Sequence, residues 1–307
     1  MSYIPSYISL YEEGILTKRI EAIRKGIEGC MLCPHKCNVD RTKHRDGKCK
    51  SGQRPIVSSF NAHFGEESCL VGRYGSGTIF FTNCNLSCIF CQNYDISHLG
   101  SGKEISYKDL ANIMLNLQAK GCHNINLVTP THMVYAILRA LPIAIEGGLR
   151  IPLVYNSGGY DSIETLHLLD GVIDIYMPDF KFMDYTIAEE LSNAKNYPNI
   201  AMNSLREMHN QVGDLLIDDR GIAYKGLMVR HLVLPNNIAS TDRVISFIAN
   251  LSKNTYINIM NQYRPAFRAR ECFDLKRRIT LEEYDKAIDV TSSVGLKRLD
   301  KNNFFIG

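Results

Sequence analysis

Short apolar runs that alternate with longer segments of helical periodicity constrain the fold of this 307-residue chain more than any other feature. The runs are almost continuously apolar, as expected for strands of a parallel sheet that helices cover on both faces. Six strand candidates occupy residues 78–82, 124–129, 151–155, 172–177, 227–234 and 256–260, and the accompanying helix candidates occupy residues 106–120, 131–145, 162–169, 184–194, 199–216, 240–252 and 280–293. The six strand and helix units predict an α/β fold, an incomplete (β/α)6 barrel of the TIM type.

The first part of the chain does not follow this alternation. Ile15–Glu28 has the periodicity of an amphipathic helix, and a cysteine-rich segment and an irregular stretch with several glycines follow it. We therefore predict a cysteine-rich N-terminal extension over residues 1–75, the barrel over residues 76–295, and a C-terminal tail over residues 296–307.

Composition excludes several classes of function. Hydrophobic residues make up 45% of the chain, and its net charge of +3 is too small to indicate a nucleic-acid partner. No apolar run is long enough to span a membrane, and the N-terminal residues lack the pattern of a signal peptide. These features predict a cytoplasmic protein that binds neither nucleic acid nor membrane. In that compartment, cysteines favour metal ligation over disulfide bonds.

A triple-cysteine motif, Cys84-x-x-x-Cys88-x-x-Cys91, directly follows the first strand candidate. Three thiolates at this spacing can hold three irons of a [4Fe–4S] cluster, whereas electron-transfer clusters usually take four cysteines. The fourth iron would remain open to a substrate or cofactor, and the Phe90 ring could cover one side of the cluster or of a bound base. The alternatives are three buried structural cysteines or a partial zinc site.

A second cysteine group precedes the barrel. Its members, Cys30, Cys33, Cys37 and Cys49, supply four thiolates that could close the coordination shell of a structural zinc ion or of an auxiliary iron–sulfur cluster. The bound metal would either stabilise the fold of the loop-rich extension or relay electrons. Basic residues gather nearby, and they form either a solvated loop or a docking face for an acidic electron donor or protein substrate. These basic residues are Arg41, Lys43, Arg45, Lys48, Lys50 and Arg54.

The motif of Cys84, Cys88 and Cys91 resembles the signature of radical S-adenosylmethionine (SAM) enzymes. The run from Cys91 through Asn93 to Asp95 resembles the activating enzymes of pyruvate formate-lyase, a glycyl-radical enzyme. Further runs are similar to the PflX-like homologues of these activases: Leu32-Cys-Pro-His-Lys-Cys37, Gly75-Ser-Gly-Thr-Ile-Phe-Phe81, Asn126-Leu-Val-Thr-Pro-Thr-His132, Asp174-Ile-Tyr-Met-Pro-Asp-Phe-Lys181, Val229-Arg-His-Leu-Val-Leu-Pro235 and Met260-Asn-Gln-Tyr263.

The resemblance implies a partial barrel whose open cluster iron binds SAM through its amino and carboxylate groups. Reductive cleavage of SAM would give methionine and a 5′-deoxyadenosyl radical that abstracts a hydrogen atom. An electron donor of the flavodoxin or ferredoxin type and a protein or peptide substrate belong to the same expectation.

The resemblance also suggests residues that contact SAM, with departures from the family pattern. Thr129, Thr131 and His132 stand where the activases have a Gly-Gly-Glu-Pro motif for the SAM amino group, so only neutral acceptors are available here. The alternative is that Pro130 and Thr131 merely begin the next helix.

Two further segments resemble those that hold a monovalent cation beside the SAM carboxylate. Asn156 and Ser157 correspond to an aspartate and a threonine of the activases, so one negative charge is missing. Asp179 would supply charge to the cation, Lys181 would pair with the SAM carboxylate, and Arg230, inside an apolar strand, would reach SAM. Ordinary buried ion pairs are the alternative for these three residues.

Three functions follow as hypotheses. The first is a radical SAM oxidoreductase that resembles the activating enzymes of glycyl-radical proteins. The second is a radical SAM enzyme that modifies a peptide or a small molecule, which the missing glutamate and the additional cysteines favour. The third is a non-catalytic iron–sulfur or zinc scaffold that binds another protein.

Overall fold

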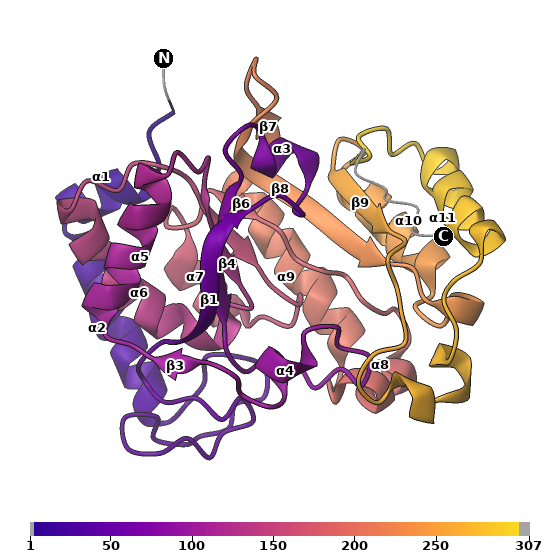
Figure 1. Cartoon of the computed structure of the whole chain (residues 1–307), viewed down its shortest axis with the longest axis horizontal. Coiled ribbons are helices and arrows are strands. Elements are labelled where there is room, and N and C mark those ends of the chain that lie inside the picture. Colours follow the sequence, from indigo (N-terminus) through magenta and orange to yellow (C-terminus); the bar gives the residue numbers. More distant parts are fainter. Residues whose placement is uncertain (1–2, 301–307) are drawn as a thin grey trace.

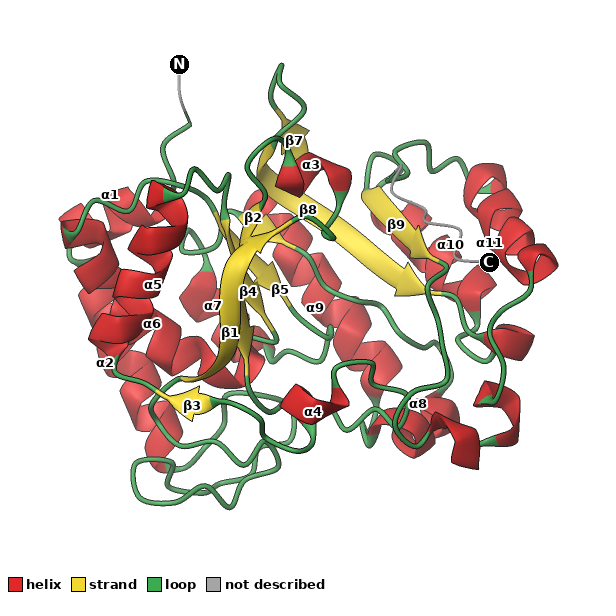
Figure 2. Cartoon of the chain, viewed as in Figure 1, coloured by secondary structure: helices red, strands yellow, loops and turns green. Residues whose placement is uncertain are grey.

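An open sheet with helices along its outer face dominates the computed structural model, which describes residues 3–300 (Figures 1 and 2). The sheet has nine strands in the order β3-β1-β2-β4-β5-β6-β8-β7, with β9 paired to β8. Six successive strands are parallel: β2 (Ser76–Phe81), β4 (Ile125–Val128), β5 (Leu153–Asn156), β6 (Ile175–Tyr176), β8 (Ala223–Leu232) and β9 (Tyr256–Met260). The sheet does not close on itself, so the predicted partial (β/α)6 barrel is confirmed.

The helices that follow the strands lie close to their predicted positions. They are α5 (Tyr107–Ala119), α6 (Val134–Glu146), α7 (Ile163–Leu169), α8 (Tyr185–Ser192), α9 (Tyr197–Val212), α10 (Thr241–Leu251) and α11 (Leu281–Ser293). Single turns of 3₁₀ helix form η1 (Thr131–Met133), η2 (Pro235–Asn237), η3 (Ala269–Glu271) and η4 (Phe273–Leu275). The helix predicted to reach residue 216 ends earlier, because Gly213 adopts a φ of 70° and β7 (Leu216–Ile217) turns back to pair with β8.

The extension begins with two helices, α1 (Tyr7–Glu12) and α2 (Ile15–Glu28), which pack against α6. Tyr7 on α1 and three apolar side chains of α2 are buried, as the periodicity of α2 predicts. The sequence did not predict α1, which is too short to show a clear period. Our division between the extension and the barrel stays a prediction, and residues 301–307 of the predicted tail lie outside the described part.

Strand β1 (Ile56–His63) was also not predicted. It pairs antiparallel with β2, and the short β3 (Lys103–Glu104) pairs with its first two residues. Most of β1 beyond Val57 is exposed or half-buried, so it lacks the apolar pattern on which strand prediction depends. Two further short helices, α3 (Ser68–Val71) and α4 (Tyr94–Ser97), complete the elements. Between residues 3 and 300, every helix is too short or too polar to cross a bilayer.

Candidate functional site

The three cysteines of the motif surround one cavity at the C-terminal ends of the parallel strands. We call residues 84–91 the cluster loop; it begins three residues after β2 ends. The cavity has a volume of about 270 Å³, and Cys84, Cys88 and Cys91 all line it. In parallel barrels this edge of the sheet carries the chemistry. The other chemically important side chains that line the cavity are Thr129, Asn156, Ser157, Asp179, Lys181 and Arg230.

Each sulfur of the cluster loop has a hydrogen-bonding neighbour. The partners are the Leu86 backbone N–H for Cys84 (3.3 Å), the Ser192 hydroxyl for Cys88 (3.0 Å) and the Ser97 hydroxyl for Cys91 (3.1 Å). Burial raises the pKa of the Cys84 and Cys88 thiols, so proton loss requires a cation or metal nearby. Hydrogen bonds to cluster sulfurs are a normal feature of iron–sulfur sites.

The arrangement of the sulfurs fits a cluster better than a single ion. Across residues 3–300, no three His, Cys, Asp or Glu side chains are placed to hold one metal ion. The partial zinc site that the motif left open therefore finds no support in this geometry. Three sulfurs spread around one cavity, each with a hydrogen-bonding neighbour, match the donor set of a [4Fe–4S] cluster with one open iron.

An ion-pair network forms the wall of the cavity opposite the cluster loop. Asp179 accepts from Lys181 Nζ at 2.6 Å and from Arg230 Nε at 2.8 Å, while Arg230 Nη2 donates to Asn156 Oδ1 at 2.7 Å. Burial alone would raise the pKa of Asp179, but the charges of Arg230 and Lys181 outweigh it and hold the pKa below its ordinary value. Asp179 is therefore ionised, and Lys181 and Arg230 place two cationic groups at the cavity.

Two carboxylates that the sequence analysis did not select lie behind Arg230. Glu66 and Glu67 each place an oxygen 3.8 Å from Arg230 Nη1, and Asn258 Nδ2 donates to Glu67 Oε1 at 3.0 Å. The other oxygen of Glu67 is buried without a hydrogen-bond partner. Burial raises the pKa of Glu67 to about 7, although the charge of Arg230 opposes that shift. No sequence pattern marks these residues, which lie in an irregular stretch.

A buried aspartate organises the residues after β4 and β5. Asp161 accepts hydrogen bonds from Thr131 Oγ1 (2.7 Å), Tyr155 Oη (2.9 Å) and Ser157 Oγ (2.7 Å). Burial raises its pKa. The sequence analysis missed Asp161, and Thr131, a predicted SAM contact, lies behind the cavity wall rather than on it.

Of the remaining predicted residues, His132 does not line the cavity, whereas Thr129, Asn93 and Phe90 do. His132 is buried beside Thr82, whose carbonyl lies 2.9 Å from Nε2, and burial lowers the pKa of His132 to about 4, so the ring is neutral at pH 7. Thr129 and Asn93 line the cavity. Phe90 also lines it and packs edge-on against Phe182, with ring centroids 5.9 Å apart.

The second cysteine group lies beside the cluster loop and does not line the cavity. Cys30, Cys33 and Cys49 are buried, and Cys37 is half-buried. Burial and the nearby thiols of the other three together raise the pKa of the Cys33 thiol to about 12, although a backbone hydrogen bond at His35 opposes the shift. The structure therefore brings these four predicted ligands together.

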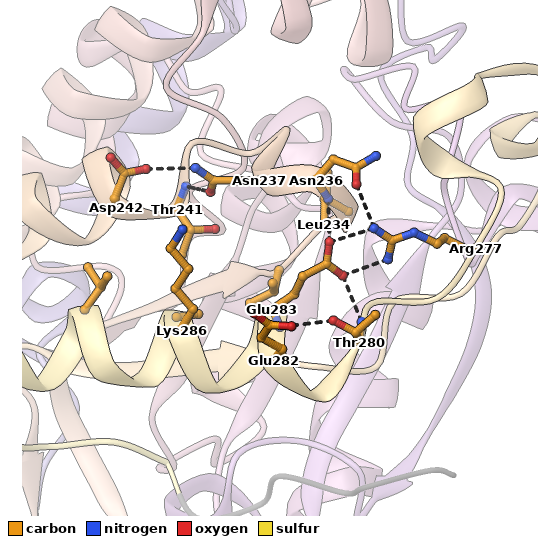
Figure 3. A pocket seen from close by; sticks show the side chains of 13 residues that line it. Leu234, Asn236, Asn237, Thr241, Asp242, Arg277, Thr280, Glu282, Glu283 and Lys286 are labelled. Atoms are coloured by element: carbon orange, nitrogen blue, oxygen red, sulfur yellow. Dashed lines mark hydrogen bonds and ion pairs between the residues drawn. The ribbon is translucent and has the colours of Figure 1, made fainter.

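A separate cavity of about 640 Å³ lies between η2, α10 and α11 (Figure 3). One ion pair lies within it: Arg277 contacts Glu283 at 2.8 Å and donates to Asn236 Oδ1 at 2.7 Å. Asn237 Nδ2 likewise donates to Asp242 at 3.1 Å. Cysteines do not line this cavity, so the cluster chemistry belongs to the strand ends.

Comparison with known proteins agrees with the geometry. The family model described as the Radical SAM superfamily matches residues 78–217. A Methanocaldococcus jannaschii protein, "Uncharacterized protein MJ0674", is 35% identical over 292 residues, which cover 92% of this chain and 80% of that protein.

Two solved structures of Streptococcus suis SuiB are similar in fold. The structure bound to the precursor peptide SuiA has a TM-score of 0.51 and 15% identity, and the match covers 71% of this chain and 46% of SuiB. The structure bound to S-adenosylmethionine has a TM-score of 0.50 and 14% identity, with coverage of 71% and 47%. The chain thus spans about half the length of the SuiB chains it matches.

Proposed function

The chain belongs to the radical SAM superfamily, and on this premise we propose that it cleaves SAM reductively and uses the resulting radical to abstract hydrogen from a protein or peptide. The observation that carries the proposal is that Cys84, Cys88 and Cys91 share one cavity with the ion-pair network of Asp179, Lys181 and Arg230. When bound at these cysteines, a [4Fe–4S] cluster supplies the electron that splits SAM into methionine and a 5′-deoxyadenosyl radical.

The wall of the cavity gives the chain's own residues distinct roles. Lys181 pairs with the SAM carboxylate as a compact charge, and Asp179 holds its ammonium group in place at 2.6 Å. Thr129 offers a neutral oxygen near the SAM amino group. Phe90, which is buried at the edge of the cavity, covers one side of the bound cofactor and excludes water.

We also propose that Arg230, which the sequence analysis expected to reach SAM, takes the place that the family resemblance assigned to a monovalent cation. Its guanidinium bonds to Asn156 at 2.7 Å and to Asp179 at 2.8 Å, the two residues expected to bind that cation. A fixed positive charge at this position compensates Asp179 without a metal ion. We therefore propose that SAM cleavage here does not depend on sodium or potassium, which exchange into a salt of a bulky organic cation would test.

An open sheet edge supports a protein or peptide substrate. Beyond Val57, no described strand pairs with the outer edge of β1, whereas β2 on its inner edge carries Phe80, which lines the cavity. Phe60 on β1 and Phe64, which follows it, are 42% and 58% exposed. An extended peptide added to β1 by backbone hydrogen bonds would lie near the cavity. This recognition mode suits a glycine-containing loop, as in the activating enzymes that the sequence resembles.

Release of 5′-deoxyadenosine tests the proposal directly. Anaerobically reconstituted, dithionite-reduced protein should release it from SAM, and Cys88→Ala should abolish the release while Cys272→Ala leaves it unchanged. No release from the wild-type protein with about four irons bound in the cluster loop would refute the proposal. A glycyl doublet in the electron paramagnetic resonance spectrum of a candidate partner would identify an activating enzyme, and its absence from all partners would favour peptide modification.

A further inference from the structure

The four cysteines of the N-terminal group occupy a loop built around them. Cys30 donates its N–H to Val39 O at 2.9 Å and accepts at its carbonyl from Asn38 N at 3.0 Å. The backbone N–H of Lys48 points at Cys37 Sγ, 3.3 Å away. The segment that carries Cys49 is thereby fixed against the segment that carries the other three cysteines.

Backbone strain accompanies these cysteines. Lys36, Asn38 and Lys50 all have positive φ, at 43°, 54° and 48°, although none is glycine. The left-handed conformation is unfavourable for a non-glycine residue and persists where surrounding interactions impose it. Each of these residues is adjacent to Cys37 or Cys49, so the strain lies where ligands would be held.

A buried cation without a carboxylate partner points to negative charge at the same place. Arg41 is 4% exposed and donates to the carbonyls of Ser51, Gly52 and His132, and its Nη1 lies 3.9 Å from Cys30 Sγ. None of the ion pairs between residues 3 and 300 involves Arg41. A buried charge is costly unless it is compensated, and metal-bound thiolates would compensate it.

The geometry favours an iron–sulfur cluster over zinc. Zinc with four cysteines needs all sulfurs about 2.3 Å from one ion. Within the described chain, no three cysteine or other ligand side chains are arranged around one ion, and this holds equally for the cluster loop. Neither cysteine group in the described chain is therefore arranged as a single-ion site, and the N-terminal group shares this property with the cluster loop.

The two groups also share a boundary. Both neighbours of Cys84 bond to the N-terminal group: Asn83 Nδ2 donates to Ser51 Oγ at 3.2 Å, and Asn85 O lies 2.7 Å from His35 Nε2. Ser51 lies two residues after Cys49, and His35 lies two residues after Cys33. Direct hydrogen bonds on both sides of Cys84 thus join the segments that carry the two sets of thiolates.

We propose that Cys30, Cys33, Cys37 and Cys49 hold a second iron–sulfur cluster, which relays electrons to the cluster at Cys84, Cys88 and Cys91. A low-potential one-electron carrier protein reduces the second cluster and is itself oxidised by one electron. The electron then passes to the first cluster without any bond being made or broken. Only the relay rests on the proposed function, because the metal site does not depend on SAM chemistry.

Iron content tests the metal site. A variant with Cys84, Cys88 and Cys91 all changed to Ala, reconstituted anaerobically, should keep about four irons and four sulfides, and the further change Cys33→Ser should remove them. The reciprocal variant changes Cys30 and Cys33 to Ser in the otherwise native chain. It should lose about four irons and keep about four. Because the two variants test the same site independently, misfolding of one of them would not decide the question. Stoichiometric zinc, or no metal, in the first variant would overturn the proposal.

Reduction kinetics test the relay. In the Cys30→Ser, Cys33→Ser variant, the first cluster should be reduced by dithionite as in the wild type but should lose its fast reduction by a flavodoxin-type carrier. The first cluster is followed by the change in its paramagnetic resonance spectrum when SAM is added. An unchanged fast phase with the carrier would overturn the relay even if the iron counts support the second cluster.

Discussion

Two buried arginines serve the two cysteine groups in opposite ways. Arg230, whose side chain is 17% exposed, lies within 4 Å of Asp179, Glu66 and Glu67 behind the cluster loop. Within residues 3–300, Arg41, behind the N-terminal group, bonds only to carbonyls and a thiol. The charge of Arg230 is therefore compensated by carboxylates of the chain itself. On the proposal above, the charge of Arg41 is compensated only when the neighbouring cysteines bind metal as thiolates. The polar groups around the SAM site are already paired with one another, whereas the stability of the proposed second site would depend on the metal that it binds.

The largest expected effect comes from removing the compensated arginine. Arg230→Met removes the cation beside Glu67 and one of the two cations that bond to Asp179, and breaking such a largely buried network costs about 3–5 kcal/mol. We expect this loss in the free energy of unfolding of metal-free protein, measured by urea denaturation at pH 7.5. Arg220→Met, in an exposed pair with Asp218, should change it by less than about 0.5 kcal/mol. Similarly small losses of unfolding free energy in both variants would mean that Arg230 does not compensate the buried carboxylates.

Loss of the uncompensated arginine should have an effect that depends on the metal. Arg41→Met in metal-loaded protein removes the hydrogen bonds to three carbonyls and the cation beside the thiolates, at a cost of about 2–3 kcal/mol. In metal-free protein, relief of the uncompensated buried charge offsets part of this loss. Urea unfolding of both forms checks the difference, with Arg24→Met in the exposed pair with Glu28 as the control. An equal loss in both forms would mean that metal does not compensate Arg41.

The barrel was predictable because its pattern is local. Each parallel strand is a short apolar run bounded by turns, and burial of both faces makes that run continuous. Strand β1 escaped prediction because it lies near the sheet edge with Phe60 exposed, so it lacks a continuous apolar run, and α3 separates it from its pairing partner β2 along the chain. Helix α9 ended early because a glycine and a hairpin, rather than its own periodicity, set its boundary.

The candidate site was predictable only where its ligands are close in sequence. The motif of Cys84, Cys88 and Cys91 is a single loop, so spacing alone identifies it. Arg41, Glu67 and Asp161 carry no local pattern, and their importance arises from contacts between distant segments. Asp161, for example, explains why Thr131 turns away from the cavity.

The pH dependence of stability gives a second test of the charge compensation around Arg230. The pKa of Glu67, raised by burial to about 7 from 4.5, means that its contribution to stability is full below about pH 4.5 and is lost as pH rises through 7. Glu67→Gln removes this dependence. Between pH 5.5 and pH 8, the free energy of unfolding of wild type relative to Glu67→Gln should therefore fall by about 2 kcal/mol.

Urea denaturation of metal-free protein across this range measures the fall. The exposed Glu190→Gln serves as the matched control and should show no such trend. If Glu67→Gln instead lost stability relative to wild type as pH rose, Glu67 would be stabilised as an anion, and the three carboxylates would be fully compensated by Arg230 and Lys181.

The smallest expected effect concerns the exposed surface of the N-terminal group. Lys43, Arg45 and Arg54 surround a shallow cavity of about 180 Å³ beside Arg41. An acidic carrier protein would meet positive charge there, which speeds encounter more than it strengthens binding. Arg54→Gln should therefore slow reduction by such a carrier severalfold at low ionic strength, and the difference should vanish at about 0.5 M salt, where the Debye length falls to a few ångströms.

The matched control for this surface is Arg73→Gln, which removes an exposed charge just after α3, at the opposite end of β1 in Figure 1. Stopped-flow reduction at two salt concentrations separates the variants, because a general effect of net charge would slow both equally. Equal rates for Arg54→Gln and wild type at low salt would place the docking surface elsewhere. If, in addition, the second cluster received no electrons from the carrier, its role would be to stabilise the extension and not to transfer electrons to the SAM site.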